Sequence, residues 1–261
     1  MKRRYKGELI KIIPRSPGNT FELTPEHPVL SVRRSRISGS SRGPHRWSDI
    51  RPDKLEKVDP EYVKAGDLTD GDLLVFPIPQ AQRDDKSVSD DFLSLLGYYV
   101  SEGCATKFNG YDALEFSLGL HEKSNVREVA NLIKKLIGKK PSITYDHKRN
   151  GVYLVVYSKE WTQTFTRHGG KYADQKRLSQ TIMDLPPSRQ RLFLRTYYKG
   201  DGSVSYEGRL KRVRATTVSK QLAFQLQELW ARQGRFAYIN IREPYDEVMK
   251  NGRRIFHKRK Y

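Results

Sequence analysis

Two short stretches of the sequence each place an acidic residue where an apolar helix should end. Residues 95–103 read LLGYYVSEG, and residues 194–202 read LRTYYKGDG. Each has a Tyr pair in its middle and finishes with an acid followed by Gly, Glu102 in the first and Asp201 in the second. Two carboxylates brought close together repel each other unless a cation lies between them. If the two helices pack side by side, this pattern predicts a metal site at their shared end, and such oxygen ligands suit Mg²⁺.

The residues around the acids favour such packing. Small residues, Gly97 and Ser101 in the first stretch and Thr196 and Gly200 in the second, would let the two helices approach closely. A single acid of this kind would be an ordinary polar helix end. The matched pair favours the metal site.

The signals that follow the two acids also repeat in the same order. DALEFSLGL after Glu102 and RVRATTV after Asp201 are each predicted to form a strand. A helix should follow each strand, begun by Ser and stopped by Gly, at residues 124–138 and 219–234. Each copy then continues into a predicted hairpin with Asn-Gly at its tip, at residues 150–151 and 251–252. These matches indicate an internal duplication with a period of 99 residues, the separation of the two acids.

The two copies differ in length. We place the first at residues 86–187 and the second at residues 188–261, which stops before the position that matches Lys176 of the first copy. The second copy is therefore expected to be truncated, with one face of its sheet left uncovered. Apolar residues expected to be exposed there are Phe236, Ile239, Ile241 and Ile255.

The composition favours a polyanionic partner. The chain has 49 Lys and Arg against 30 Asp and Glu, a net charge of +19, which is typical of nucleic-acid binding, although a merely basic surface would also give it. The single cysteine, Cys104, excludes an internal disulfide and a cysteine-rich zinc site, and we interpret it as a small buried residue. The sequence offers no apolar run of about 18 residues that could span a membrane. We expect a cytoplasmic protein with no membrane partner.

The two stretches resemble the paired LAGLIDADG (dodecapeptide) motifs of homing endonucleases, and the resemblance covers about residues 88–261. It implies an α+β fold of two pseudo-symmetric αββαββα repeats, whose saddle-shaped sheets straddle the major groove of double-stranded DNA in a monomer. It also makes Glu102 and Asp201 the catalytic, Mg²⁺-binding acids. The sequence departs from the motif in having Glu at the first acid, and in Arg195 and Lys199, where apolar residues are usual.

Further site residues follow from the same resemblance. The segment GGKYADQKRL is similar to a family stretch that carries a basic catalytic residue, which makes Lys176 the first candidate and Lys171 the second, although an ordinary phosphate contact or a solvated lysine would also fit. DNA contacts are expected from strand and hairpin residues, each more often a backbone contact than a base contact. These candidates are Tyr145, His147, Lys148 and Arg149 in the first copy, and Arg209, Lys211, Arg212 and Arg214 in the second.

Residues 1–85 have a different texture, with short β-like runs broken by Pro and Gly. Within them, TPEHPV places Thr24 and His27 in a T-x-x-H arrangement, and VKAGDLTDGDLLVFP follows. The region resembles part of the Hint fold of inteins, which implies a splicing-associated role for Thr24 and His27, although alone the motif is an ordinary turn. The opening Cys or Ser and the closing His-Asn pair of inteins are not among these 261 residues, which leaves self-excision by this chain open. The basic segment RRSRISGSSRGPHRW should be a flexible insertion.

The sequence therefore predicts an intein-encoded, site-specific, Mg²⁺-dependent DNA endonuclease with a remnant splicing segment. The alternative is a LAGLIDADG protein that has lost cleavage and binds nucleic acid, as a maturase or regulator would. A splicing domain with a decayed endonuclease is a further alternative.

Overall fold

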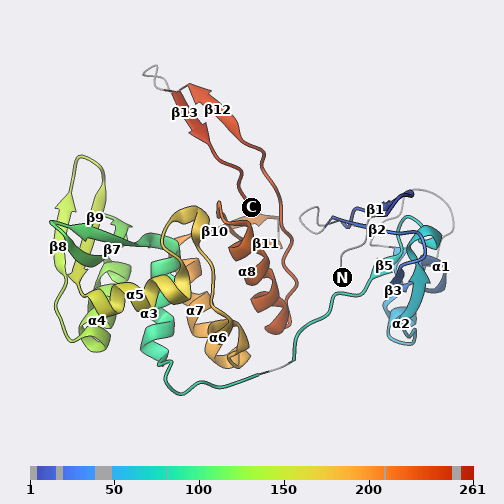
Figure 1. Cartoon of the computed structure of the whole chain (residues 1–261), viewed down its shortest axis with the longest axis horizontal. Helices are drawn as coiled ribbons and strands as arrows, with labels where there is room; N and C mark the ends of the chain where they lie inside the picture. Colours follow the sequence, from blue (N-terminus) through green and yellow to red (C-terminus); the bar gives the residue numbers. More distant parts are fainter. Residues whose placement is uncertain (1–4, 16–19, 39–48, 81, 209, 249–253) are drawn as a thin grey trace. The chain divides into compact units, whose positions relative to one another are not determined.

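The computed structural model describes residues 5–15, 20–38, 49–80, 82–208, 210–248 and 254–261. They fall into two compact units, Met1–Ile78 and Pro79–Tyr261, shown in Figure 1. Among the described residues, no helix has both the length and the apolar character needed to cross a membrane.

The first unit is built from short strands. β1 (Ile10–Ile12) pairs with β2 (Phe21–Leu23), and β3 (Pro28–Val32) pairs with β4 (Glu61–Lys64) and β5 (Leu73–Leu74) in a three-stranded antiparallel sheet. Two short helices, α1 (Arg34–Ile37) and α2 (Pro52–Leu55), follow β3. The Asp72 carboxylate fixes the start of α1, because it accepts hydrogen bonds from the Arg34 amide at 2.8 Å and the Arg33 guanidinium at 3.1 Å.

The segment predicted to be a flexible insertion, residues 33–47, is ordered at its start. Its first residues form α1, and the side chain of Ile37 is fully buried. A buried apolar side chain of this kind orders the backbone that carries it, which composition alone does not reveal. Residues 39–47 of the insertion lie outside the described residues.

The second unit begins with a complete αββαββ arrangement followed by further helices (Figure 1). Its elements are α3 (Asp90–Glu102), β6 (Gly103–Phe108), β7 (Tyr111–Gly119), α4 (Lys123–Ile137), β8 (Ser142–Asp146), β9 (Gly151–Tyr157), α5 (Lys159–Gly169) and α6 (Gln180–Asp184). The strands form one antiparallel sheet in the order β6-β7-β9-β8. Alternate residues of its central strands, such as Leu114, Phe116, Leu154 and Val156, are buried on one face against the helices.

The turns of this sheet differ from those predicted. Asn109 and Gly110, with φ of 49° and 84°, form the two-residue connection between β6 and β7, an Asn-Gly signal that marks this hairpin. The predicted Asn150-Gly151 tip is instead a longer turn at residues 147–150. There the Asp146 side chain accepts hydrogen bonds from the amides of Lys148 and Arg149, each at 3.0 Å, and thereby stabilises the wider turn.

The second half repeats the order of elements but not the sheet. α7 (Pro187–Gly200), β10 (Gly202–Glu207), β11 (Leu210–Ala215), α8 (Lys220–Arg232), β12 (Tyr245–Val248) and β13 (Arg254–His257) follow one another. In the described residues β10–β11 and β12–β13 are two separate hairpins, whereas the matching strands of the first half share one sheet.

The exposed apolar residues of this half were predicted only in part. Phe236 is 46% exposed, but Ile239 is 6% exposed and so belongs to the interior, while Ile241 and Ile255 are half-buried. The prediction for Ile239 is therefore wrong. Other exposed apolar side chains of this half lie on the β10–β11 hairpin, at Val204, Tyr206 and Val213.

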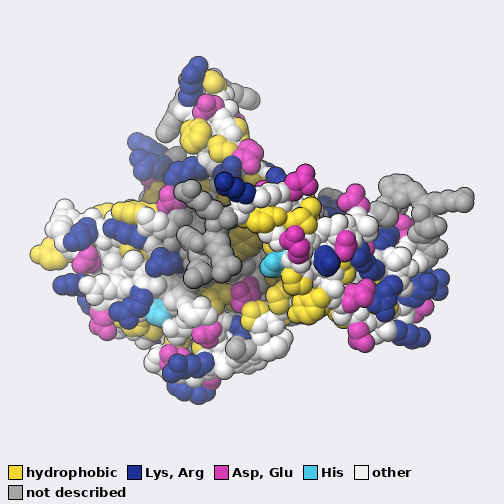
Figure 2. Space-filling view, turned by 45° about the vertical axis from the view of Figure 1, so that its right-hand side comes forward, with side chains coloured by type: hydrophobic (Ala, Val, Ile, Leu, Met, Phe, Trp, Pro, Cys, Tyr) yellow, Lys and Arg dark blue, Asp and Glu magenta, His cyan; other side chains and the backbone are white. Residues whose placement is uncertain are grey.

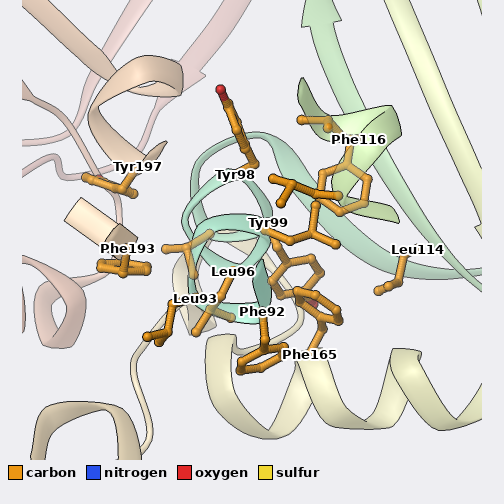
Figure 3. Close-up of a cluster of buried hydrophobic side chains, with 14 of the residues drawn as sticks. Phe92, Leu93, Leu96, Tyr98, Tyr99, Leu114, Phe116, Phe165, Phe193 and Tyr197 are labelled. Carbon is orange, nitrogen blue, oxygen red and sulfur yellow. The ribbon is translucent and has the colours of Figure 1, made fainter. Parts of the chain in front are cut away.

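The core of the second unit is centred on α3. All residues from Phe92 to Val100 are buried, so this helix is covered on every side. Figure 3 shows Phe193 and Tyr197 of α7 on one side of α3, and Phe116 and Phe165 on the other. The Tyr99 ring lies 5.1 Å from that of Phe165 between ring centroids. Because α3 is fixed on both sides, its C-terminal end is held rigidly in place.

Candidate active site

The two helices that carry the acids pack directly against each other. A Cβ atom added at Gly97 of α3 would lie 2.0 Å from Thr196 Oγ1 of α7. A Cβ atom added at Gly200 of α7 would lie 2.3 Å from Ser101 Oγ of α3. Such distances leave no room for a side chain at either glycine. The small residues identified in the sequence are thus the contact points of the helix pair.

The Gly after each acid is needed for the same reason. α3 ends at Glu102, and α7 ends at Gly200 with Asp201 as its C-cap. A Cβ atom at Gly103 would lie 2.7 Å from Tyr99 Cα, and one at Gly202 would lie 2.0 Å from the Tyr198 carbonyl oxygen. The chain turns back across the end of each helix to enter a strand, and only Gly fits at that approach.

Burial perturbs both acids, and neighbouring carboxylates add to the effect at Glu102. Burial raises the pKa of Glu102 to about 7, and the nearby Asp201 and Glu122 carboxylates raise it further in the same direction. Burial also raises the pKa of Asp201 to about 6, against the lowering influence of the Tyr197 hydroxyl and Lys176. Two carboxylates that resist ionisation in one place are typical of a site built for a cation or for acid–base chemistry.

A third carboxylate, Glu122, was not identified from the sequence. Its Oε2 accepts a hydrogen bond from the Gly119 amide at 2.7 Å, and its Oε1 accepts one from Asn125 Nδ2 at 2.9 Å. These bonds fix its orientation at the start of α4, and it raises the pKa of Glu102. It is also the residue before the first turn of α4, where the sequence suggested Ser124 instead.

Lys176 reaches the end of α3 from the segment between α5 and α6. Its Nζ donates hydrogen bonds to the carbonyl oxygens of Tyr99 at 2.7 Å and Gly103 at 2.8 Å, and lies 3.7 Å from the centroid of the Tyr99 ring. The side chain is only 5% exposed, and this burial lowers the pKa of Lys176 to about 7. The ammonium group therefore points into the protein and holds the backbone on both sides of Glu102.

The segment around Lys176 also joins the two halves. The hydroxyl of Ser219, the N-cap residue of α8, donates to the Lys176 carbonyl oxygen at 2.6 Å. The Gln225 side chain bonds both the amide and the carbonyl of Leu178, each at 2.8 Å. These contacts connect the second half of the molecule to the backbone that supports Glu102.

The polar residues in the motif helices form a network between the halves. The Tyr98 hydroxyl donates to Glu128 Oε2 at 2.8 Å, and Lys199 donates to the same oxygen. Arg195 lies 3.9 Å from Glu128 Oε1. Lys199 and Arg195, which departed from the apolar motif, are thus the partners of a glutamate on α4.

The acids fit a small hard cation. Among the described residues there is no cluster of three or more His, Cys, Asp or Glu side chains arranged to hold a metal. A pair of carboxylates is nevertheless what Mg²⁺ takes from proteins, since it keeps several waters and completes its shell with phosphate oxygens. Glu102 and Asp201 could hold the ion: burial raises the pKa of both, the Asp201 carboxylate raises that of Glu102 further, and a bound cation would offset the cost of ionising them.

The remaining candidates of the first half lie on other elements than the acids do. Lys171 is half-buried, and its Nζ lies 5.0 Å from the centroid of the neighbouring Tyr172 ring. His147, Lys148 and Arg149 lie together on the exposed turn between β8 and β9. Tyr145 pairs with Val152, a buried core residue, so it lies on the helix-covered face of the sheet edge although it is 58% exposed.

The candidates of the second half lie on the β10–β11 hairpin. Arg212 and Arg214 pair with Ser205 and Ser203 on one face, and Lys211 is on the opposite face with Tyr206. Arg209 lies outside the described residues. Figure 2 shows Lys and Arg side chains spread over the face that it presents, with hydrophobic side chains between them.

Thr24 and His27 occupy a tight turn in the first unit. The His27 amide donates to the Thr24 carbonyl oxygen at 3.0 Å, and the Ala65 amide donates to the His27 carbonyl oxygen at 2.8 Å. The His27 side chain is exposed. The structure thus brings the TPEH turn beside the Ala65–Asp67 turn, the two motifs that the sequence singled out here.

Comparisons with known proteins identify a domain family that matches two segments of the chain. A family model described as a LAGLIDADG-like domain matches residues 90–170 and 188–259, segments that begin with α3 and α7. An iron–sulfur cluster assembly SufBD family protein of Mycobacterium tuberculosis is 30% identical over 257 residues, 98% of this chain and 30% of the relative. A DNA polymerase of Thermococcus litoralis is 36% identical over 143 residues, 53% of this chain and 8% of the polymerase.

Solved structures with a similar arrangement include two LAGLIDADG proteins. The homing endonuclease I-DmoI is 17% identical with a TM-score of 0.45, covering 66% of this chain and 85% of I-DmoI. The N-terminal LAGLIDADG domain of DUF199/WhiA is 16% identical with a TM-score of 0.39, covering 65% of this chain and 75% of that chain. The chain spans about 30% of the length of the mycobacterial relative.

Proposed function

The chain belongs to the family of LAGLIDADG-like domains, and we propose that it is an Mg²⁺-dependent endonuclease that cuts double-stranded DNA at a specific site. The observation that carries the proposal is the pair of acids at the crossing of α3 and α7, each with a raised pKa. A merely structural pair of helix ends would place a neutral or basic residue there, since a helix C-terminus disfavours negative charge. A bound divalent ion would neutralise both acids, polarise a phosphodiester and activate a water molecule.

The chain's own residues then have defined tasks. Glu102 and Asp201 would hold the cation, and Lys176 would keep the Glu102 backbone in register through its bonds to Tyr99 and Gly103. The net charge of +19 would supply the attraction to DNA phosphates. Arg212 and Arg214, with the β8–β9 turn, would contact the duplex. We propose a monomer, because both acids come from one chain, and a cytoplasmic location as the sequence suggested.

The first unit would be the remnant of an intein splicing segment, with Thr24 and His27 as its splicing-associated residues. Two findings support this part. The mycobacterial match runs through 98% of the chain, including the first unit, and the longer relatives have names as different as a SufBD family protein and a DNA polymerase. A segment that is inserted into unrelated host proteins would produce relatives with such different names. Reading the coding sequence on both sides of the chain tests this: no Cys or Ser upstream and no His-Asn downstream would overturn it.

The alternative is a LAGLIDADG protein that binds nucleic acid without cutting it. The observation that favours it is the absence of a shared sheet in the second half, where the described strands form two separate hairpins. A sheet that is not assembled presents a poorer DNA surface on that side. Both acids being present favours the endonuclease.

A plasmid assay separates the two functions. Supercoiled plasmids carrying candidate target sequences are incubated with the protein in Mg²⁺ or in EDTA, and with Glu102→Gln as the matched inactive variant. The endonuclease predicts linear product only for the wild type with Mg²⁺. A binding protein would retard the plasmids in both buffers, leave them supercoiled and be unaffected by Glu102→Gln.

A further inference from the structure

A basic hollow lies beside the edge of the first sheet, lined by neither Glu102 nor Asp201. Its walls are β6, α5 and the segment after α5, and its volume is about 410 Å³. Four cationic side chains line it, Lys107, Arg167, Lys171 and Arg177, with one carboxylate, Asp112. Lys171, the second catalytic candidate from the sequence, therefore belongs to this hollow.

Three of the four cations have no acidic partner among the described residues. Asp112 is 3.7 Å from Lys107, and this ion pair accounts for the only carboxylate in the lining. Within the part of the chain that the structure describes, Arg167, Lys171 and Arg177 make no ion pair. Like charges gathered around one space repel each other, so the arrangement is stabilised when an anion enters.

Neutral donors complete the lining. The side chains of Thr106, Gln163 and Thr166 border the same space and carry hydroxyl and amide hydrogens. Two guanidinium groups, a lysine and such donors match the tetrahedral oxygens of phosphate, for which the fork of Arg is well suited. A carboxylate ligand would leave part of this donor set unused.

The hollow lies on the helix-covered side of the sheet, at its β6 edge, and not on the opposite face. Ala105 of β6 pairs with Leu114, which is buried against the helices, and Lys107 lies two residues further along on the same face. In the described sheet β6 pairs with β7 alone, so the hollow opens at a free strand edge. A group bound there would be held from the side of α5.

We propose that this hollow, formed by Arg167, Lys171, Arg177 and Lys107, is a binding site for a phosphate group. The phosphate can come from the backbone of a bound duplex or from a free phosphate compound, and the net charge of +19 favours the duplex. The duplex source rests on the proposed function, whereas the phosphate site itself does not.

The test removes three charges from the hollow and, in a matched control, three from elsewhere. The hollow variant is Arg167→Gln, Lys171→Gln and Arg177→Gln. The control variant is Arg127→Gln, Lys134→Gln and Lys140→Gln, exposed residues on α4 and just after it. All measurements are made in EDTA, so a protein that cannot cut DNA still gives a result. Far-UV circular dichroism confirms that both variants fold.

Two binding measurements identify the source of the phosphate. Duplex binding is followed by fluorescence anisotropy between 50 and 200 mM salt, and pyrophosphate binding by calorimetry. If a phosphate of the duplex backbone occupies the hollow, the slope of log K against log salt concentration becomes shallower by about 0.9 in the hollow variant, because one phosphate contact is lost. The control variant then keeps the wild-type slope. If a free compound enters, the wild type and the control bind pyrophosphate and the hollow variant does not, with the duplex slope unchanged.

Other outcomes overturn the site. The proposal is wrong if the hollow variant matches the wild type in both measurements, or if both variants change to the same extent. The first outcome would show that the cations bind nothing, and the second that only total charge matters. Neither result bears on cleavage, so the endonuclease proposal would stand or fall on its own assay.

Discussion

Replacing Glu102 with Gln should make the metal-free protein more stable at pH 8. The carboxylate has a folded-state pKa of about 7 against an ordinary value of 4.5, because of its burial and the negative charges beside it. A group whose pKa is raised on folding contributes stability in full at pH values below its unfolded-state pKa. This contribution is lost as the pH rises through its folded-state pKa. Ionised Glu102 therefore destabilises the fold above about pH 7, and neutral Gln, which has the same shape, does not.

The size of the effect follows from the shift. Each pKa unit is about 1.4 kcal/mol, so the full shift amounts to roughly 3 kcal/mol. Glu102 is only half-buried, and solvent screens part of its interaction, so we expect roughly 1–2 kcal/mol of added stability at pH 8. At pH 5, where wild-type Glu102 is largely protonated in the folded state, the gain should fall to about a quarter of its value at pH 8.

Urea unfolding followed by Trp161 and Trp230 fluorescence at pH 5 and pH 8 measures this difference. Glu160→Gln, an exposed glutamate at the start of α5, is the control for loss of a negative charge. Mg²⁺ should stabilise the wild type at pH 8, by about 2.7 kcal/mol at a hundredfold excess over its dissociation constant, and the variant less. A variant no more stable than the wild type at pH 8, or equally stabilised at pH 5, would refute the reasoning.

Three further substitutions test the supports of the site. Gly97→Val should destabilise the protein by about 1–3 kcal/mol in urea, because even a Cβ there would lie 2.0 Å from Thr196 Oγ1; an unchanged midpoint would contradict the close helix contact. Lys176→Met should reduce plasmid cutting more than duplex affinity, because its ammonium group bonds helix-end carbonyls; equal losses would indicate a DNA contact instead. Arg189→Ala should speed trypsin cleavage just before α3, since its guanidinium ties that segment to α7. Exposed Arg191→Ala is the control, and equal rates for the two variants would exclude the tie.

The sequence predicted the centre of the site because local rules fix it. A helix that ends where a strand must begin needs Gly at the crossing, and two helices that touch need small residues at the contact. Both requirements are visible in the sequence as glycines, at Gly97, Gly103, Gly200 and Gly202. The Asn109-Gly110 turn of the first sheet is marked in the sequence by the same kind of local signal, an Asn-Gly pair.

The parts that escaped prediction depend on residues far apart in the sequence. The inward direction of Lys176 is set by the carbonyls of Tyr99 and Gly103, more than 70 residues away. Glu128 is an ordinary surface glutamate in the sequence until Tyr98 and Lys199 meet it. The separate hairpins of the second half depend on which strands pair, and alternation of residues within a strand does not specify its neighbour.

The duplication explains why the two acids share a backbone geometry and yet differ in chemistry. Helix, acid, Gly and strand must stay together in both copies, because no other residue fits where the chain crosses the helix end. The neighbours are free to diverge: Lys176 lies under the turn after Glu102, whereas the Tyr197 hydroxyl lies beside Asp201 and lowers its pKa. Burial raises the pKa of both acids, to about 7 for Glu102 and about 6 for Asp201, so the pair retains part of a proton at neutral pH. A divalent cation would displace that proton, because its ligands must be ionised. Neutralising Glu102 by substitution and neutralising the pair by metal therefore relieve the same buried negative charge, and for this reason their effects on stability should not add.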